Sequence, residues 1–184
     1  MGDKMKYNVI KEINKVGDKI KLEETFVPFL IENNITVSTG ESLTAGLIAA
    51  SIANIAGASN VLEMGAVTYT EEAKMKLLNV SRETLEKHTA VSFETAVEML
   101  RGLKEISNST LNIIATGYAG PGENSGLIYL GICYKDSVNI YRLSIKGSRN
   151  EVRKKVVNLS FYISKKIIED YEKSKLNVGK VFLA

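Results

Sequence analysis

The stretch Ser-Thr-Gly-Glu-Ser-Leu-Thr-Ala-Gly, residues 38–46, decides the fold of this chain. An apolar, β-branched run, Ile35 to Val37, precedes it, and a run rich in small residues, Leu47 to Ala56, follows it. This order is typical of a buried strand, a tight turn and the start of a helix. The unpaired N–H groups of a helix start bind anions or developing oxyanions. Ser42, inside this turn, is therefore either a helix N-cap or a nucleophile.

The composition is that of an ordinary globular domain. The 184 residues are 45% hydrophobic and 24% charged, which is enough for a full hydrophobic core without disulfides. A net charge of +3 does not require a nucleic-acid partner, and no basic aromatic stripe suggests one. The single cysteine, Cys133, excludes a disulfide within the chain and fits a reducing cytoplasm. We expect a cytoplasmic protein.

Membrane and metal sites are not expected. No apolar stretch approaches the roughly 20 residues that cross a bilayer, and residues 1–4 lack the apolar segment of a signal peptide. One histidine and one cysteine do not make a usual zinc site.

Alternating segments predict an α/β domain. Strands are expected at residues 35–39, within 61–70 with its centre at 66–69, and at 112–116, 127–134 and 138–145. Helices are expected at residues 22–33, 47–55, 71–78, 81–87, from 92 onward and over 150–170. Strands that alternate with helices favour a mixed, mostly parallel sheet between helical layers. The short connection at residues 135–137 makes the last strand pair an antiparallel hairpin.

The chain divides into an N-terminal arm (1–20), a domain (21–170) and a C-terminal tail (171–184). The arm has apolar residues at helical spacing, although residues 7–13 also fit an edge strand. The tail is charged and then apolar. Both ends favour a homo-oligomer, most simply a dimer.

Three chemically interesting segments follow three predicted strands. They are the Ser42 turn, Tyr69 with the helix after it, and the glycine-rich loop 117–122. Ligands of α/β sheets collect at the carboxyl ends of strands, so we expect these segments to form one pocket.

Ser42, Lys74 and Tyr69 can form a Ser-Lys hydrolase set. Lys74 lies one helical turn into the predicted helix, and a lysine shielded from water has a lowered pKa and acts as a base. A serine hydroxyl needs such a base at neutral pH. The backbone N–H groups of Thr44, Ala45 and Gly46 could hold the oxyanion. The alternative is that Lys74 is a solvated surface lysine beside Glu71.

Other residues are candidates for binding. The loop 117–122 can cradle a phosphate or ribose, or be only a turn. Arg149 and Arg153 lie one turn apart near a helix start, which suits a phosphate but is also common on surfaces. Glu41 can orient Lys74 or a substrate amide, or simply lie near a helix N-terminus. His88, the only histidine, is interpreted as structural.

Five segments together resemble the CinA C-terminal domain family, the PncC-like nicotinamide-nucleotide amidases. They are Glu-Ser-Leu-Thr-Ala-Gly (41–46), Val-Thr-Tyr-Thr-Glu-Glu-Ala-Lys (67–74), His-Thr-Ala-Val-Ser (88–92), Thr-Gly-Tyr-Ala-Gly-Pro-Gly (116–122) and Gly-Ser-Arg with Val-Arg (147–153). The resemblance implies a three-layer α/β/α fold. It also implies hydrolysis of the carboxamide of nicotinamide mononucleotide to nicotinate mononucleotide and ammonia, without metal or organic cofactor.

The resemblance also assigns roles to residues. The nucleophile falls on Ser42, the lysine on Lys74 and a supporting tyrosine on Tyr69. The residues expected to hold the nucleotide substrate are Glu41, Thr116, Gly117, Tyr118, Ala119, Gly120 and Arg149.

The chain departs from the family pattern at several positions. Ala45 stands where a glycine is usual, Glu71 where an asparagine is usual, and Ser148 where an aspartate is usual. The loop after Pro121 is also shorter than in relatives. A positive φ at Ala45 would cost on the order of 1–2 kcal/mol, and Glu71 favours a protonated Lys74. The alternative function is therefore a catalytically weak or inactive CinA-like protein that binds a nucleotide or a protein partner in competence or DNA-damage responses.

Overall fold

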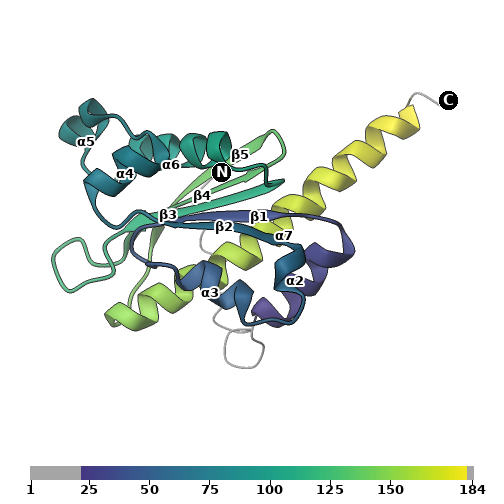
Figure 1. Cartoon of the computed structure of the whole chain (residues 1–184), viewed down its shortest axis with the longest axis horizontal. Coiled ribbons are helices and arrows are strands. Elements are labelled where there is room, and N and C mark those ends of the chain that lie inside the picture. Colours follow the sequence, from purple (N-terminus) through teal and green to yellow (C-terminus); the bar gives the residue numbers. More distant parts are fainter. Residues whose placement is uncertain (1–21, 182–184) are drawn as a thin grey trace.

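The computed structural model describes residues 22–181 of the chain (Figure 1). The arm predicted at residues 1–20 lies outside the described residues. The strands are β1 (Val37–Glu41), β2 (Leu62–Val67), β3 (Leu111–Gly117), β4 (Leu127–Tyr134) and β5 (Ser137–Ser144). The helices are α2 (Leu22–Glu32), α3 (Leu47–Ala53), the 3-10 helix η1 (Ala58–Asn60), α4 (Glu71–Leu78), α5 (Arg82–His88), α6 (Phe93–Ile106) and α7 (Arg149–Val181).

The five strands form one mixed sheet in the order β2-β1-β3-β4-β5. β1 is parallel to both β2 and β3, whereas β4 is antiparallel to both β3 and β5. Only β4 therefore runs against the other strands, which confirms the prediction of a mixed, mostly parallel sheet. The hairpin is also confirmed: Tyr134 pairs with Ser137 across its turn.

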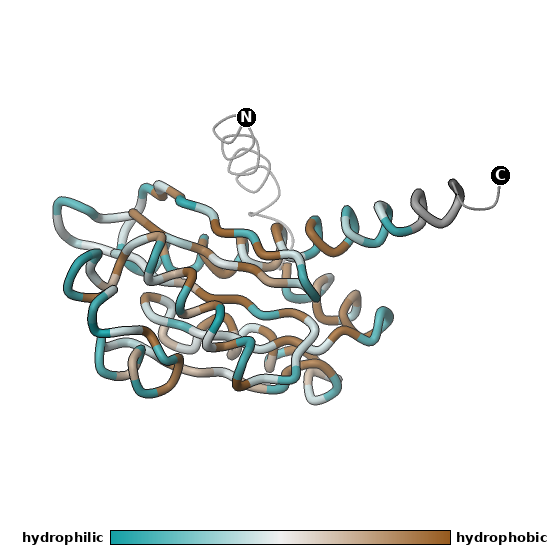
Figure 2. Tube along the Cα trace, turned by 90° about the horizontal axis from the view of Figure 1, so that it is seen from above, coloured by the Kyte–Doolittle hydropathy of each residue, from teal (hydrophilic) through white to brown (hydrophobic). Residues whose placement is uncertain are grey.

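Helices cover both faces of the sheet (Figure 1). α4, α5 and α6 lie on one face, and α2, α3 and α7 lie on the other. Neighbouring residues of β3 serve the two cores: Ile113 packs in the α2–α3–α7 core and Ile114 in the α4–α5–α6 core. This alternation follows from the two-residue period of a strand. The three-layer α/β/α arrangement is thus confirmed, and Figure 2 shows hydrophobic segments concentrated inside it.

Three helices begin at a hydroxyl cap, which explains where they start. Thr70, Ser81 and Ser92 accept hydrogen bonds from the backbone N–H groups of Ala73, Thr84 and Thr95, respectively. Such caps stabilise a helix by about 1 kcal/mol. The cap at Thr70 fixes the start of α4, and with it the position of Lys74 in the first turn.

Some predicted boundaries are wrong. β1 continues to Glu41 instead of ending at Thr39, so Ser42 is the first residue beyond the strand. β2 ends at Val67, so Tyr69 follows the strand rather than closing it. α7 continues past the expected end at Asp170 to Val181, because no proline interrupts the segment and Tyr171 packs edge-on against Tyr134. No helix in the described part of the chain has the length and apolar character to span a bilayer.

Candidate active site

A pocket of about 250 Å³ lies where the three predicted segments meet. Three of its lining segments follow strands: Ser42 follows β1, Tyr69 follows β2 and the glycine-rich loop follows β3. Lys74 lies on α4, and Arg149 is the first residue of α7. These strands are parallel, so their carboxyl ends share one edge of the sheet. The residues lining the pocket are Ser42, Leu43, Tyr69, Lys74, Ala90, Val91, Gly117, Tyr118, Ala119, Gly120, Pro121 and Arg149.

Ser42 and Lys74 are in direct contact at the bottom of this pocket. Their Oγ and Nζ atoms lie 2.9 Å apart, and the same Nζ donates a hydrogen bond to the carbonyl oxygen of Thr68, also at 2.9 Å. Lys74 is only 1% exposed and Ser42 8% exposed. The alternative in which Lys74 is a solvated surface lysine is therefore wrong.

Burial changes the acidity of Lys74. Loss of solvation lowers its pKa from 10.5 to about 8, although the carboxylate of Glu71 acts in the opposite direction and raises it. At pH 7 roughly a tenth of such an amine is unprotonated and able to take a proton from Ser42. The environment thus gives a lysine the property that a general base needs.

The turn after Ser42 has only some of its N–H groups free. The N–H of Ser42 donates to the carbonyl of Ala115, and the N–H of Ala45 donates to the carbonyl of Ser42. The N–H groups of Thr44 and Gly46 find no acceptor among residues 22–181. Of the three predicted oxyanion donors, Ala45 is therefore already engaged, whereas Thr44 and Gly46 remain.

Glu41 caps α3 and does not line the pocket. Its carboxylate accepts hydrogen bonds from the backbone N–H groups of Ile48 and Ala49 at 3.0 and 2.9 Å, and from the hydroxyl of Thr39. It is 1% exposed. Of the interpretations weighed for Glu41, the contacts favour stabilisation of the helix N-terminus, which fixes the direction of the chain leaving the Ser42 turn.

Thr116 supports the pocket from behind rather than lining it. It is fully buried, and its hydroxyl donates to the carbonyl of Ala90 at 2.7 Å. Ala90 and Val91 form a wall of the pocket that the sequence reasoning did not identify. Both belong to the 88–92 motif, but neither has a reactive side chain to attract attention. His88, in the same motif, lies 3.7 Å from a carboxylate oxygen of Glu94.

Arg149 connects two sides of the pocket mouth. Its guanidinium donates to the carbonyl oxygen of Gly120 at 2.9 Å and to the hydroxyl of Tyr69 at 2.7 Å. Tyr69 is 53% exposed and hydrogen-bonds to Arg149 rather than to Lys74 or Ser42. Tyr118, Ala119 and the glycines beside them also line the pocket.

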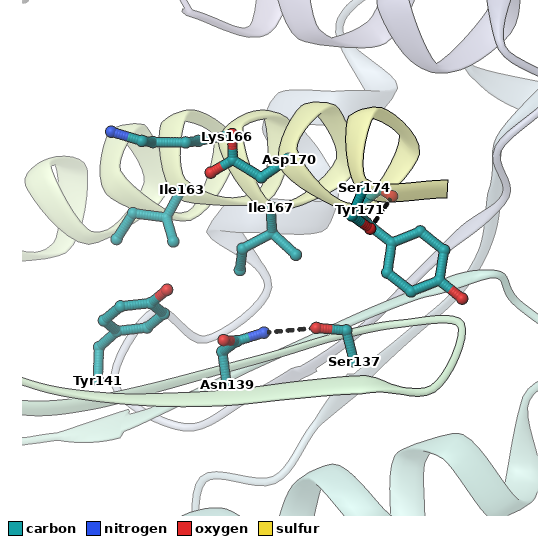
Figure 3. Close-up of a pocket in the computed structure, with 9 residues that line it drawn as sticks. All are labelled: Ser137, Asn139, Tyr141, Ile163, Lys166, Ile167, Asp170, Tyr171 and Ser174. Atoms are coloured by element: carbon teal, nitrogen blue, oxygen red, sulfur yellow. Dashed lines mark hydrogen bonds between the residues drawn. The ribbon is translucent and has the colours of Figure 1, made fainter. Parts of the chain in front are cut away.

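Two other features bear on the choice of site. Within the described part of the chain, His, Cys, Asp and Glu form no group of three or more that could hold a metal ion. A second cavity, of about 360 Å³, lies between β5 and α7 and shares no lining residue with the Ser42 pocket (Figure 3). Its serine Ser137 accepts a hydrogen bond from Asn139 and has no lysine partner there.

Comparison with known proteins identifies the family. The sequence model of the CinA C-terminal domain matches residues 19–168. The chain belongs to this family. Two putative competence-damage inducible proteins are 40% identical (Clostridium acetobutylicum) and 42% identical (Clostridium novyi) to it. They are matched over 86% and 76% of this chain. The chain spans only 39% and 35% of those relatives' lengths.

Solved structures of competence/damage-inducible proteins share the fold. The competence/damage inducible protein CihA from Agrobacterium tumefaciens is 33% identical with a TM-score of 0.74, and the match covers 78% of this chain and 91% of that one. The competence damage-inducible protein A from Klebsiella pneumoniae is 28% identical with a TM-score of 0.76, covering 80% and 96%.

Ala45 adopts a left-handed conformation with φ 49°. We expect Ala45→Gly to raise the free energy of unfolding by about 0.5–1 kcal/mol, because relief of the strained φ outweighs the entropy that glycine adds to the unfolded chain. Denaturant titration measures this change. Ala50→Gly, at an exposed position inside α3, is the control and should lower stability by about 0.5–1 kcal/mol. If Ala45→Gly and Ala50→Gly lowered the free energy of unfolding equally, the backbone at Ala45 would not be strained.

Proposed function

We propose that this protein hydrolyses the carboxamide of nicotinamide mononucleotide, giving nicotinate mononucleotide and ammonia. The observation that supports this most directly is the buried contact of 2.9 Å between Lys74 Nζ and Ser42 Oγ. A serine becomes a useful nucleophile only beside a base, and this pair lines a pocket of about 250 Å³. The substrate is the one that the CinA family resemblance implies.

The proposed reaction has two steps, acylation of Ser42 and hydrolysis of the acyl-enzyme. Its Oγ attacks the amide carbonyl carbon while its proton passes to Nζ of Lys74, and the oxyanion of the tetrahedral intermediate is held by backbone N–H groups of the turn. Lys74 then gives that proton to the leaving nitrogen, and ammonia departs from the acyl-enzyme. A water molecule attacks the ester, its proton passes to Lys74, and collapse of the intermediate releases the carboxylic acid and restores the Ser42 hydroxyl.

The pocket mouth provides groups suited to the nucleotide part. Arg149 is cationic and presents a planar fork that suits phosphate oxygens. The backbone of Gly117 and Gly120 allows close approach of a ribose or phosphate. We assign substrate positioning to these residues and proton transfer to Lys74.

The direct test is a reaction of purified protein with nicotinamide mononucleotide, followed by ammonia measurement and chromatography of the nucleotide. We expect equal amounts of ammonia and nicotinate mononucleotide. The second candidate, a binding protein without useful activity, is favoured by one observation: the carboxylate of Glu71 opposes the lowering of the Lys74 pKa. That candidate predicts protection against heat by the nucleotide with no ammonia release.

Glu71 gives a pH-dependent prediction. Activity should rise with pH as Lys74 loses its proton, with a midpoint near the pKa of about 8. Glu71→Gln removes the carboxylate that raises this pKa, so the midpoint should move to lower pH by about 0.2–0.7 pH units, the effect of an exposed ion pair. A pH profile of kcat/KM measures the shift. Glu72→Gln, which removes a neighbouring exposed carboxylate, is the control; an identical profile for both variants would rule out the role of Glu71.

A further inference from the structure

Arg153 lies behind the Ser42 turn, one helical turn after Arg149 on α7. Its Nε donates to the carbonyl oxygen of Leu43 at 3.1 Å, and one terminal nitrogen donates to the carbonyl oxygen of Thr44 at 2.8 Å. The side chain is half-buried and does not line the Ser42 pocket. One planar fork thus holds two successive carbonyl groups, a geometry that a lysine does not reproduce.

These contacts fix the direction of the neighbouring N–H groups. In a trans peptide, the N–H points opposite to the carbonyl of the preceding residue. Holding the Leu43 carbonyl against Arg153 therefore turns the N–H of Thr44 to the other side of the turn. Holding the Thr44 carbonyl likewise directs the N–H of Ala45, which donates to the carbonyl of Ser42 at 3.1 Å. The N–H of Thr44 has no acceptor within residues 22–181.

The charge on Arg153 also acts through the peptide bond. A cationic donor on a carbonyl oxygen draws electron density from the amide, which makes the N–H of the same peptide a stronger donor. The Leu43–Thr44 peptide is therefore both oriented and polarised. An oxyanion formed beside Ser42 would benefit from both effects, since fixed donors need no reorganisation when the charge develops.

We propose that Arg153 is a positioning residue for the oxyanion hole, which holds the N–H of Thr44 ready for the charge that forms when Ser42 attacks. The inference rests on the proposed function only in taking Ser42 as the nucleophile. It differs from a phosphate-binding role for Arg153, because both contacts of the guanidinium are to main-chain carbonyls and Arg153 itself does not line the pocket.

The test compares Arg153→Met, Arg153→Lys and Arg153→Ala with Lys154→Met, a matched control at the next, exposed position of α7. Steady-state kinetics with nicotinamide mononucleotide give kcat and KM separately. A second assay follows covalent modification of Ser42 by a fluorophosphonate, whose reaction also develops an oxyanion but needs no nicotinamide group. Circular dichroism checks the folding of each variant. If Arg153→Met does not fold, Arg153→Lys replaces it in the comparison with the control.

We expect Arg153→Met to lower kcat and the rate of Ser42 modification by about 10–100-fold, somewhat less than the loss of an oxyanion donor itself, with little change in KM. Arg153→Lys should recover part of this loss. Millimolar guanidinium, well below denaturing concentrations, should raise the rate of Arg153→Ala but not of the control.

A raised KM with unchanged kcat would overturn the inference, and so would equal Ser42 modification rates in Arg153→Met and Lys154→Met. Absence of Ser42 modification in the unaltered protein would overturn it as well. If the unaltered protein releases no ammonia while Arg153→Met still slows the modification of Ser42, the amidase proposal fails and the role of Arg153 stands.

Discussion

Ser42→Ala is expected to lower ammonia release from nicotinamide mononucleotide by at least about 10⁴-fold, because no other group can form the acyl-enzyme. Ser42 is the only hydroxyl that hydrogen-bonds to Lys74 within residues 22–181. Loss of the nucleophile removes the whole two-step route, and later steps cannot compensate. The measurement is single-turnover ammonia release with a large excess of enzyme.

The control for this variant is Ser59→Ala, which removes an exposed serine hydroxyl from η1, outside the pocket. It should keep the activity of the unaltered protein. The Ser42 variant should also keep the ability of the nucleotide to raise its melting temperature, because Arg149 and the glycine-rich loop remain. Residual turnover well above about 0.01% of the unaltered rate in Ser42→Ala would contradict nucleophilic catalysis by Ser42.

Much of the site was predictable because parallel strands bring their carboxyl ends to one edge. Ser42, Tyr69 and the loop from Gly117 each follow a strand, and the pocket contains all three. The helix predicted at residues 71–78 has the observed bounds of α4, Glu71–Leu78, and the structure adds the cap at Thr70. Helix and strand boundaries of this kind depend on residues that are adjacent in the sequence, so a single sequence is enough to predict them.

The contacts that give these residues their properties were not predictable. Lys74 is buried and donates to the carbonyl of Thr68, and spacing alone encodes neither the burial nor this contact. Arg153 reaches the carbonyl of Leu43 across 110 positions of sequence. Glu41 was ambiguous because its partners, the N–H groups of α3, come close only when the turn is folded. Long-range hydrogen bonds of this kind depend on the assembled layers.

The role of Lys74 as the general base can be tested by measuring both activity and stability. Lys74→Met should lower kcat by about 10²–10⁴-fold, the range of general base catalysis, while keeping a side chain of similar length in the buried site.

The effect of Lys74 on the free energy of unfolding should depend on pH. The pKa of Lys74 is lowered from 10.5 to about 8 in the folded protein, so below pH 8 both folded and unfolded states bind the proton and the folded state bears the full desolvation penalty.

Between about pH 8 and 10.5 the unfolded chain binds more protons at Lys74 than the folded protein does, so this group makes the protein more stable as the pH rises. The methionine variant has no such group. The free energy of unfolding of the unaltered protein should therefore increase relative to Lys74→Met by about 2–3 kcal/mol from pH 7 to pH 10. Urea titrations at several pH values measure the difference, and Lys76→Met, an exposed lysine on the same helix, is the control. A difference that stays constant over this range would mean that the amine is solvated, and a solvated Lys74 could not activate Ser42 at neutral pH.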